Sequence, residues 1–246
     1  MKSIKKTQWE ASYRRKENYI FYPKEEVVKF LNRFVIKKLG LNDYQYILTP
    51  HSNKKVIIGL DFGCGIGAQT ILMHEFGIEA YGLDISEEAI NTAKNLAATK
   101  GYKDLINRFL VYDGKKISFP DNYFDICISE SVLDSMPFSL AKELIKEIDR
   151  CTSQLAFISL ISGDNDKFYR EYDGDEIVKD KHEHGTIQSY YNYNKILNLI
   201  SGTKFSIKWI RLIQEIGINH RYLYGRYYIV LEKQRWVREK FWQLQV

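Results

Sequence analysis

The chain has 246 residues, 45% of them hydrophobic and 27% charged, which is the composition of an ordinary globular domain whose core needs no disulfide or metal. No apolar run reaches the roughly 18 residues that span a bilayer, the basic N-terminus lacks an apolar export segment, and the net charge of +5 is spread along the chain. Membrane and nucleic-acid partners are therefore not expected, the three cysteines fit no metal motif, and we predict a cytoplasmic protein of one domain, residues 1–246.

The first 50 residues are expected to form an N-terminal lid and a helix. Residues 9–22 are polar and aromatic, and Pro23 with two acidic residues behind it then opens a helical pattern. Gly40 closes this helix, and residues 41–53 have the composition of a connector.

Residues 54–161 alternate between short apolar strands and helices, in units of about 30 residues, which predicts a parallel sheet with right-handed crossovers. The predicted strands cover residues 56–60, 80–84, 108–112, 124–128 and 155–161, and the predicted helices cover residues 68–76, 87–100 and 140–150.

Residues 162–204 are predicted to form a cap over the site. Residues 163–184 are rich in Asp, Lys, Tyr and His without a clear period, and long ordered loops in compact domains tend to be functional. A helix is expected over residues 193–200. The closing segment, 205–246, is expected to form a strand pair over residues 205–215 and 226–232.

A glycine-rich turn, Gly63-Cys64-Gly65-Ile66-Gly67, leaves the first buried strand. Glycines let the backbone approach a ligand closely, and the helix that follows offers unpaired N–H groups. Asp84 ends the second strand, 84 − 63 = 21 residues after the first loop glycine, where a carboxylate can accept hydrogen bonds from ribose hydroxyls. The pattern also fits a dinucleotide loop, or a turn that merely packs a helix on a strand.

Two further carboxylates favour S-adenosylmethionine (SAM) over a nicotinamide dinucleotide. Asp61 lies two residues before the first loop glycine, where it can hold an ammonium group but would repel a pyrophosphate. Asp113 and Gly114 end the third strand, where the carboxylate can accept a hydrogen bond from an adenine amino group. The sheet also ends in a strand pair instead of a second nucleotide-binding half.

Residues 56–86 resemble motif I of class I SAM-dependent methyltransferases, which runs (D/E)-x-G-x-G-x-G, and residues 119–131 resemble the fourth-strand segment of their small-molecule branch. The resemblance implies a Rossmann-like, seven-stranded α/β sheet with a reversed last strand, and S-adenosylhomocysteine as the product. It implies that Asp61, Gly63 and Gly65 face the methionine end, and that Glu130 and Ser131 border the sulfonium. The expected cofactor-binding residues are Asp61, Gly63, Cys64, Gly65, Gly67, Asp84, Ile85, Asp113, Gly114, Glu130 and Ser131.

The cap carries the candidate catalytic residues. Methylation of a hydroxyl requires a base to take up its proton, and histidine is the usual candidate because its pKa lies near neutrality. His184 is our first choice and His182 the second, although both could equally be exposed loop residues. A metal site built on these histidines is weaker, since no second ligand cluster accompanies them.

The expected substrate contacts come from three other segments. Arg221 and His220 lie in the last hairpin turn, where the arginine could clamp a carboxylate or phosphate, Tyr22 precedes the first helix, and Asp134 follows the fourth strand. No Asn-Pro-Pro-Tyr or Asp-Pro-Pro-Tyr tetrapeptide follows that strand, which argues against amino methylation of nucleic-acid bases.

We therefore predict methyl transfer from SAM to a hydroxyl of a small polar, anionic metabolite such as a sugar, a sugar acid or a phosphorylated hydroxy acid. The main competing hypothesis is N-methylation of a small amine held by a carboxylate cage of Glu130, Asp134 and Glu183. Two more functions are compatible with the sequence, namely SAM binding without catalysis and methylation of a protein or a nucleic acid.

Overall fold

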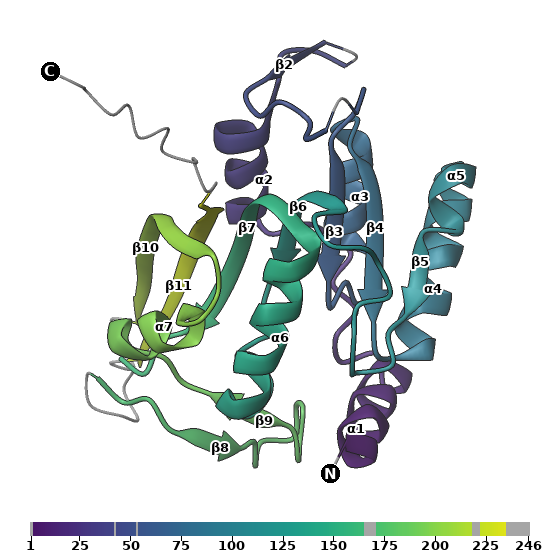
Figure 1. Cartoon of the computed structure of the whole chain (residues 1–246). Helices are drawn as coiled ribbons and strands as arrows, with labels where there is room; N and C mark the ends of the chain where they lie inside the picture. Colours follow the sequence, from purple (N-terminus) through teal and green to yellow (C-terminus); the bar gives the residue numbers. More distant parts are fainter. Residues whose placement is uncertain (1, 42, 53, 165–170, 218–221, 235–246) are drawn as a thin grey trace, which may run out of the picture.

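In the computed structural model, which describes residues 2–41, 43–52, 54–164, 171–217 and 222–234, a seven-stranded sheet runs through the molecule (Figure 1). Its strand order is β10-β11-β7-β6-β3-β4-β5. The strands of this sheet are β3 (Ile58–Phe62), β4 (Glu79–Asp84), β5 (Phe109–Val111), β6 (Phe124–Ser129), β7 (Thr152–Ile161), β10 (Phe205–Gly217) and β11 (Tyr222–Lys233).

The pairing confirms the expected topology. Strands β3 to β7 pair in parallel, whereas β11 is antiparallel to both of its neighbours, β7 and β10. The chain winds outward in one direction from β3 to β5 and then returns to place β6 on the other side of β3. The carboxyl ends of β3 and β6 therefore flank a topological switch point, where open α/β sheets bind their ligands.

Helices cover both faces of the sheet, and alternate residues of β7 show which helices share a face. Leu155 and Phe157 pack in a cluster with helices α2, α3 and α4, whereas Ala156 and Ile158 pack in a cluster with α6 and α7. Strands buried on both faces read as nearly continuous apolar runs, which is why they were visible in the sequence. The helices are α2 (Glu25–Phe30), α3 (Ala68–Glu75), α4 (Glu87–Thr99), α5 (Lys103–Ile106), α6 (Phe138–Cys151) and α7 (Tyr193–Ile200).

The N-terminal segment differs from the prediction. It begins with a helix, α1 (Lys2–Arg14), where only a polar and aromatic stretch was expected. The helix expected to reach Gly40 instead ends in a π-helical turn, η1 (Leu31–Val35), and continues as a short strand, β1 (Ile36–Lys38), which pairs with β2 (Tyr44–Tyr46) in the expected connector. The side chain of Asn32 accepts a hydrogen bond from the backbone N–H of Lys38 and so stabilises this turn (3.2 Å).

The cap is also more regular than predicted, since β8 (Asp175–Ile177) and β9 (Ile187–Ser189) form a hairpin within it. The buried ammonium group of Lys195 on α7 fixes this hairpin by contacts to Asp175 (3.2 Å) and to the Ser189 hydroxyl (3.0 Å). Helix α1 and the hairpin lie at the same edge of the sheet, the edge where the parallel strands end (Figure 1). Within the described ranges, no helix combines the length and the apolar character that crossing a membrane requires.

At the amino-terminal ends of the central strands, the buried carboxylate of Asp125 on β6 joins the N-terminal connector to β3. It accepts hydrogen bonds from the backbone N–H groups of His51 (2.7 Å) and Ile58 (2.9 Å). We expect Asp125→Ala to lower the free energy of unfolding by about 3 kcal/mol, because both donors lose their partner and one lies in the buried strand. Chemical denaturation measures this change. The exposed Asp104→Ala serves as the control, and equal stability of the two variants would contradict the assigned role.

Candidate active site

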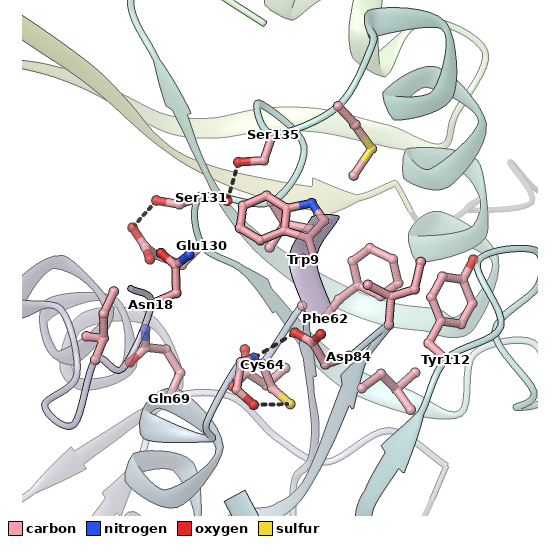
Figure 2. A pocket seen from close by; sticks show the side chains of 18 of the residues that line it. Trp9, Asn18, Phe62, Cys64, Gln69, Asp84, Tyr112, Glu130, Ser131 and Ser135 are labelled. Carbon is pink, nitrogen blue, oxygen red and sulfur yellow. Dashed lines mark hydrogen bonds between the residues drawn. The ribbon is translucent and has the colours of Figure 1, made fainter. Parts of the chain in front are cut away.

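A cavity of about 440 Å³ lies at the carboxyl ends of β3, β4, β5 and β6 and is covered by helix α1. Figure 2 shows a polar side of this cavity, with Asn18, Gln69 and Glu130, and an apolar side, with Phe62 and Tyr112. Of the expected cofactor-binding residues, those that line it are Asp61, Gly63, Cys64, Gly65, Asp84, Ile85, Asp113, Gly114, Glu130 and Ser131.

Close packing explains the glycines of the loop. Gly63 and Gly65 have φ angles of 77° and 53°, and a Cβ atom at Gly63 would lie 2.3 Å from the side chain of Val132. Gly67 does not line the cavity, contrary to expectation. Its φ is 90°, and a Cβ atom there would lie 2.8 Å from the Phe109 ring, so it allows α3 to pack against the sheet.

Two buried carboxylates lie at the ends of the central strands. Asp61 accepts a hydrogen bond from the Thr70 hydroxyl (2.7 Å), and burial raises its pKa to about 7. Asp84 accepts hydrogen bonds from the backbone N–H groups of Gly65 (2.8 Å) and Ser86 (2.9 Å), and burial raises its pKa to about 6. Both carboxylates are desolvated, and no cationic side chain among the described residues forms an ion pair with either of them. A ligand ammonium or a pair of ligand hydroxyl groups would therefore stabilise their ionised forms.

The turn after β6 brings two polar side chains to the cavity. The hydroxyl of Ser131 donates a hydrogen bond to Glu130 (2.7 Å), and its backbone N–H donates to the hydroxyl of Ser159 on β7 (2.9 Å). Ser131 has a φ of 57°, an uncommon conformation for a residue with a side chain, and such strain clusters at functional sites.

Helix α1 covers the cavity where an N-terminal lid was expected, but the helix over residues 2–14 and its lining residues were not predicted. Trp9 and Tyr13 are four residues apart, so they lie on one face of α1, and both line the cavity (Figure 2 shows Trp9). The carboxylate of Glu10 fixes the helix to the start of α4, because it accepts hydrogen bonds from the Ser86 hydroxyl (2.7 Å) and the Glu87 N–H (3.0 Å). The spacing of these two aromatic residues was the available signal for a helix.

The cap brings one of the two candidate histidines to the cavity. His182 lines it together with Glu183 and Gln188. His184 is exposed and lies outside the lining, with its Nδ1 atom 3.2 Å from the carbonyl oxygen of Lys179.

Of the expected substrate contacts, the two that the structure describes do not line the cavity. Tyr22 is 84% exposed and outside the lining, and Arg221 and His220 lie outside the described residues. Asp134 is buried behind the cavity wall, where its carboxylate is ion-paired with Arg226 (2.9 Å).

Arg226 is a lining residue that sequence reasoning did not single out. Its Nη1 atom donates to Asp134 and its Nε atom to the hydroxyl of Tyr224 (2.8 Å), so its side chain is held against the wall by both partners. Its place next to the tyrosines and aliphatic residues of β11 was the available signal.

Residues 60–159 match the family model described as methyltransferase domain. The chain is similar to an ajmaline N-methyltransferase of Rauvolfia serpentina (30% identity, 42% of this chain and 35% of the relative) and to a probable tocopherol O-methyltransferase of Oryza sativa (30% identity, 45% of this chain and 30% of the relative). The matched part therefore spans about a third of the length of these relatives.

A solved SAM-dependent methyltransferase of Methanosarcina mazei has the same fold. The two structures align with a TM-score of 0.60 at 20% identity, over 73% of this chain and 93% of the other. The matched residues, 60–159, include all the expected cofactor-binding residues that line the cavity, but neither α1 nor the cap.

The raised pKa of Asp61 gives a stability prediction. Ionisation of a buried acid is disfavoured in the folded state, so this residue's contribution to stability is complete below its ordinary pKa and is lost as the pH rises through about 7. Asp61→Asn removes this loss. We expect its Tm, relative to wild type, to be at least about 2 °C higher at pH 8 than at pH 5, since 1 kcal/mol corresponds to about 2–4 °C. Differential scanning calorimetry measures the difference. A pH-independent difference, as expected for the exposed control Asp104→Asn, would refute the assignment.

Proposed function

We propose that residues 60–159, which match a methyltransferase domain, are of the class I, SAM-dependent type, and that the chain transfers the methyl group of SAM to a hydroxyl of a small molecule enclosed by α1 and the cap. The observation that carries the proposal is that one cavity joins the glycine loop and its carboxylates to the cap residues His182 and Glu183.

The lining fits the cofactor chemically. The buried Asp61 can hold the ammonium group of the methionine end, Asp84 can accept hydrogen bonds from the ribose, and the loop residues Gly63 and Gly65 line the same cavity. SAM supplies an electrophilic methyl group on a sulfonium. The protein supplies orientation and exclusion of water, and a group that takes the proton of the acceptor hydroxyl.

The cap supports an enzyme over a non-catalytic binding module. A module that only binds SAM has no need of proton-accepting groups beyond the cofactor-binding loop, yet His182 and Glu183 both reach the cavity from the cap. Trp9 and Tyr13 enclose the same space from above, which favours a small molecule as the acceptor.

N-methylation of a small amine is the second candidate. It is favoured by the two acceptor-side carboxylates that line the cavity, Glu130 and Glu183, which suit a cationic amine. Asp134, the third member of the expected cage, is ion-paired with Arg226. The anionic character of the acceptor was inferred from Arg221, the candidate bases and the net positive charge, and it stays a prediction, as do the cytoplasmic location and the absence of nucleic-acid and membrane partners.

The experiment that tests the proposal is methyl transfer from SAM labelled with tritium in its methyl group. In one arm, wild-type protein is incubated with the hydroxyl acceptors glucose, glucuronate, 3-phosphoglycerate and hydroquinone. In a separate arm it is incubated with the amines phenethylamine and spermidine. A small-molecule cell extract is tested alongside, and each labelled product is identified as an ether or an amine. We expect label in products of the hydroxyl arm. Label confined to amines would establish the second candidate, and SAM binding without any transfer would refute both.

Cofactor binding should depend on Asp84. We expect Asp84→Ala to weaken the binding of S-adenosylhomocysteine by about 10- to 100-fold, because hydrogen bonds to a charged group contribute roughly 1.5–3 kcal/mol. Isothermal titration calorimetry measures the affinity, and circular dichroism verifies that the variant is folded. The exposed Asp104→Ala should bind as wild type does, and an unchanged affinity in Asp84→Ala would place the ribose elsewhere.

A further inference from the structure

The turn between β8 and β9 presents Glu183 to the cavity in an uncommon backbone conformation. Glu183 has a φ of 57°, in the left-handed region that residues with a side chain rarely adopt. Its side chain is 23% exposed and lines the cavity, whereas the neighbouring His182 side chain is 59% exposed. A strained residue that aims a carboxylate into a cavity points to a functional role.

Hydrogen bonds within the cap hold Glu183 in this conformation. Its carbonyl oxygen accepts two hydrogen bonds from Thr186, one from the backbone N–H (3.0 Å) and one from the hydroxyl (2.8 Å). The N–H of Gly185 donates to the carbonyl oxygen of Val178 on the other arm of the hairpin (2.9 Å). The direction of the Glu183 side chain is therefore fixed by its own turn.

The same turn rests on the N-terminal segment. The N–H of Glu183 donates to the carboxylate of Glu17 (3.4 Å), which is itself held by Arg15 (2.8 Å). A Cβ atom at Gly185 would lie 2.9 Å from the side-chain nitrogen of Gln8 on α1, so the turn and the helix are in close contact there. The contacts that connect the N-terminal segment to the cap therefore also hold the turn that carries Glu183.

The groups facing Glu183 suit a proton acceptor. Burial is the largest influence and raises the pKa of its carboxyl group, whereas His182, 3.6 Å away, lowers it. The other ionisable groups that face it are Glu17, Asp134 and the phenol of Tyr13. The carboxylate is therefore more basic than an exposed glutamate, as a proton acceptor requires.

We propose that Glu183 is the catalytic base that receives the proton of the acceptor hydroxyl, in place of either neighbouring histidine. This inference rests on the proposed function. As the acceptor oxygen forms its bond to the methyl carbon, the carbon–sulfur bond breaks and its electron pair stays on sulfur, which becomes a neutral thioether. The O–H bond breaks in the same reaction, and its proton passes to a carboxylate oxygen of Glu183. Sulfonium, carboxylate and alcohol thus become thioether, carboxylic acid and ether, and charge and atoms balance.

The test compares Glu183→Gln, which keeps the shape and removes the charge, with Asp180→Asn, a matched change at an exposed position in the same cap. Rates are measured with the hydroxyl acceptor of the panel above that wild type methylates fastest. We expect Glu183→Gln to lower kcat by about 100-fold or more, the usual contribution of a general base, and to leave the affinity for S-adenosylhomocysteine within about threefold of wild type. Asp180→Asn should match wild type in both measurements.

The pH profile distinguishes a base from a merely structural residue. The wild-type kcat should rise with pH through a pKa above that of an ordinary glutamate, and this rise should be absent in the residual activity of Glu183→Gln. A Glu183→Gln variant with wild-type kcat, or one that keeps the wild-type pH profile while His182→Ala loses it, would overturn the proposal. Failure of the wild type to methylate any acceptor would instead count against the proposed function.

Discussion

The hydrogen bonds around Asp84 are the interaction on which the site depends. This one carboxylate accepts from Gly65 in the loop after β3 and from Ser86 at the start of α4, and so sets the distance between the first two strands' carboxyl ends. The hydroxyl of Ser86 continues the chain of contacts to Glu10 on α1. The loops at the strand ends and helix α1, which covers the cavity, are therefore connected through Asp84, Ser86 and Glu10. This connection requires a carboxylate to be buried.

Two segments far apart in the sequence, α1 and the cap, enclose the cavity on the side away from the strand ends. Helix α1 contributes Trp9 and Tyr13, and the cap contributes His182 and Glu183. They touch each other as well as the sheet, through Gln8 against Gly185 and Glu17 against the N–H of Glu183. Because a methyl transfer requires water to be excluded and the acceptor to be oriented, contact between these two segments is a physical requirement of the proposed reaction and not an incidental feature of packing.

The positions of strands that are buried on both faces were predicted best from the sequence. The strands near 56–62, 80–84 and 124–129 were predicted within a few residues, and the cofactor-binding carboxylates followed from their place at the strand ends. A lid was expected at the N-terminus, but its helix over residues 2–14 was missed because α1 carries its two aromatic residues among polar ones, a pattern too weak to predict a helix. The preference for His184 came from its intrinsic pKa, but which residue of the 182–184 turn faces inward depends on the left-handed backbone at Glu183.

The residues proposed to bind the cofactor and those proposed to enclose the acceptor come from different parts of the chain, which has an evolutionary consequence. All the carboxylates proposed to bind the cofactor lie within residues 60–159, the part that matches the family model, whereas α1 and the 182–188 part of the cap, which enclose the proposed acceptor space together with Glu130, lie outside that range. Selection can therefore alter α1 and the cap by insertion, deletion or substitution without disturbing the glycine loop. Lineages that inherit the same glycine loop and strand-end carboxylates can diverge to different acceptors and keep a common methyl donor.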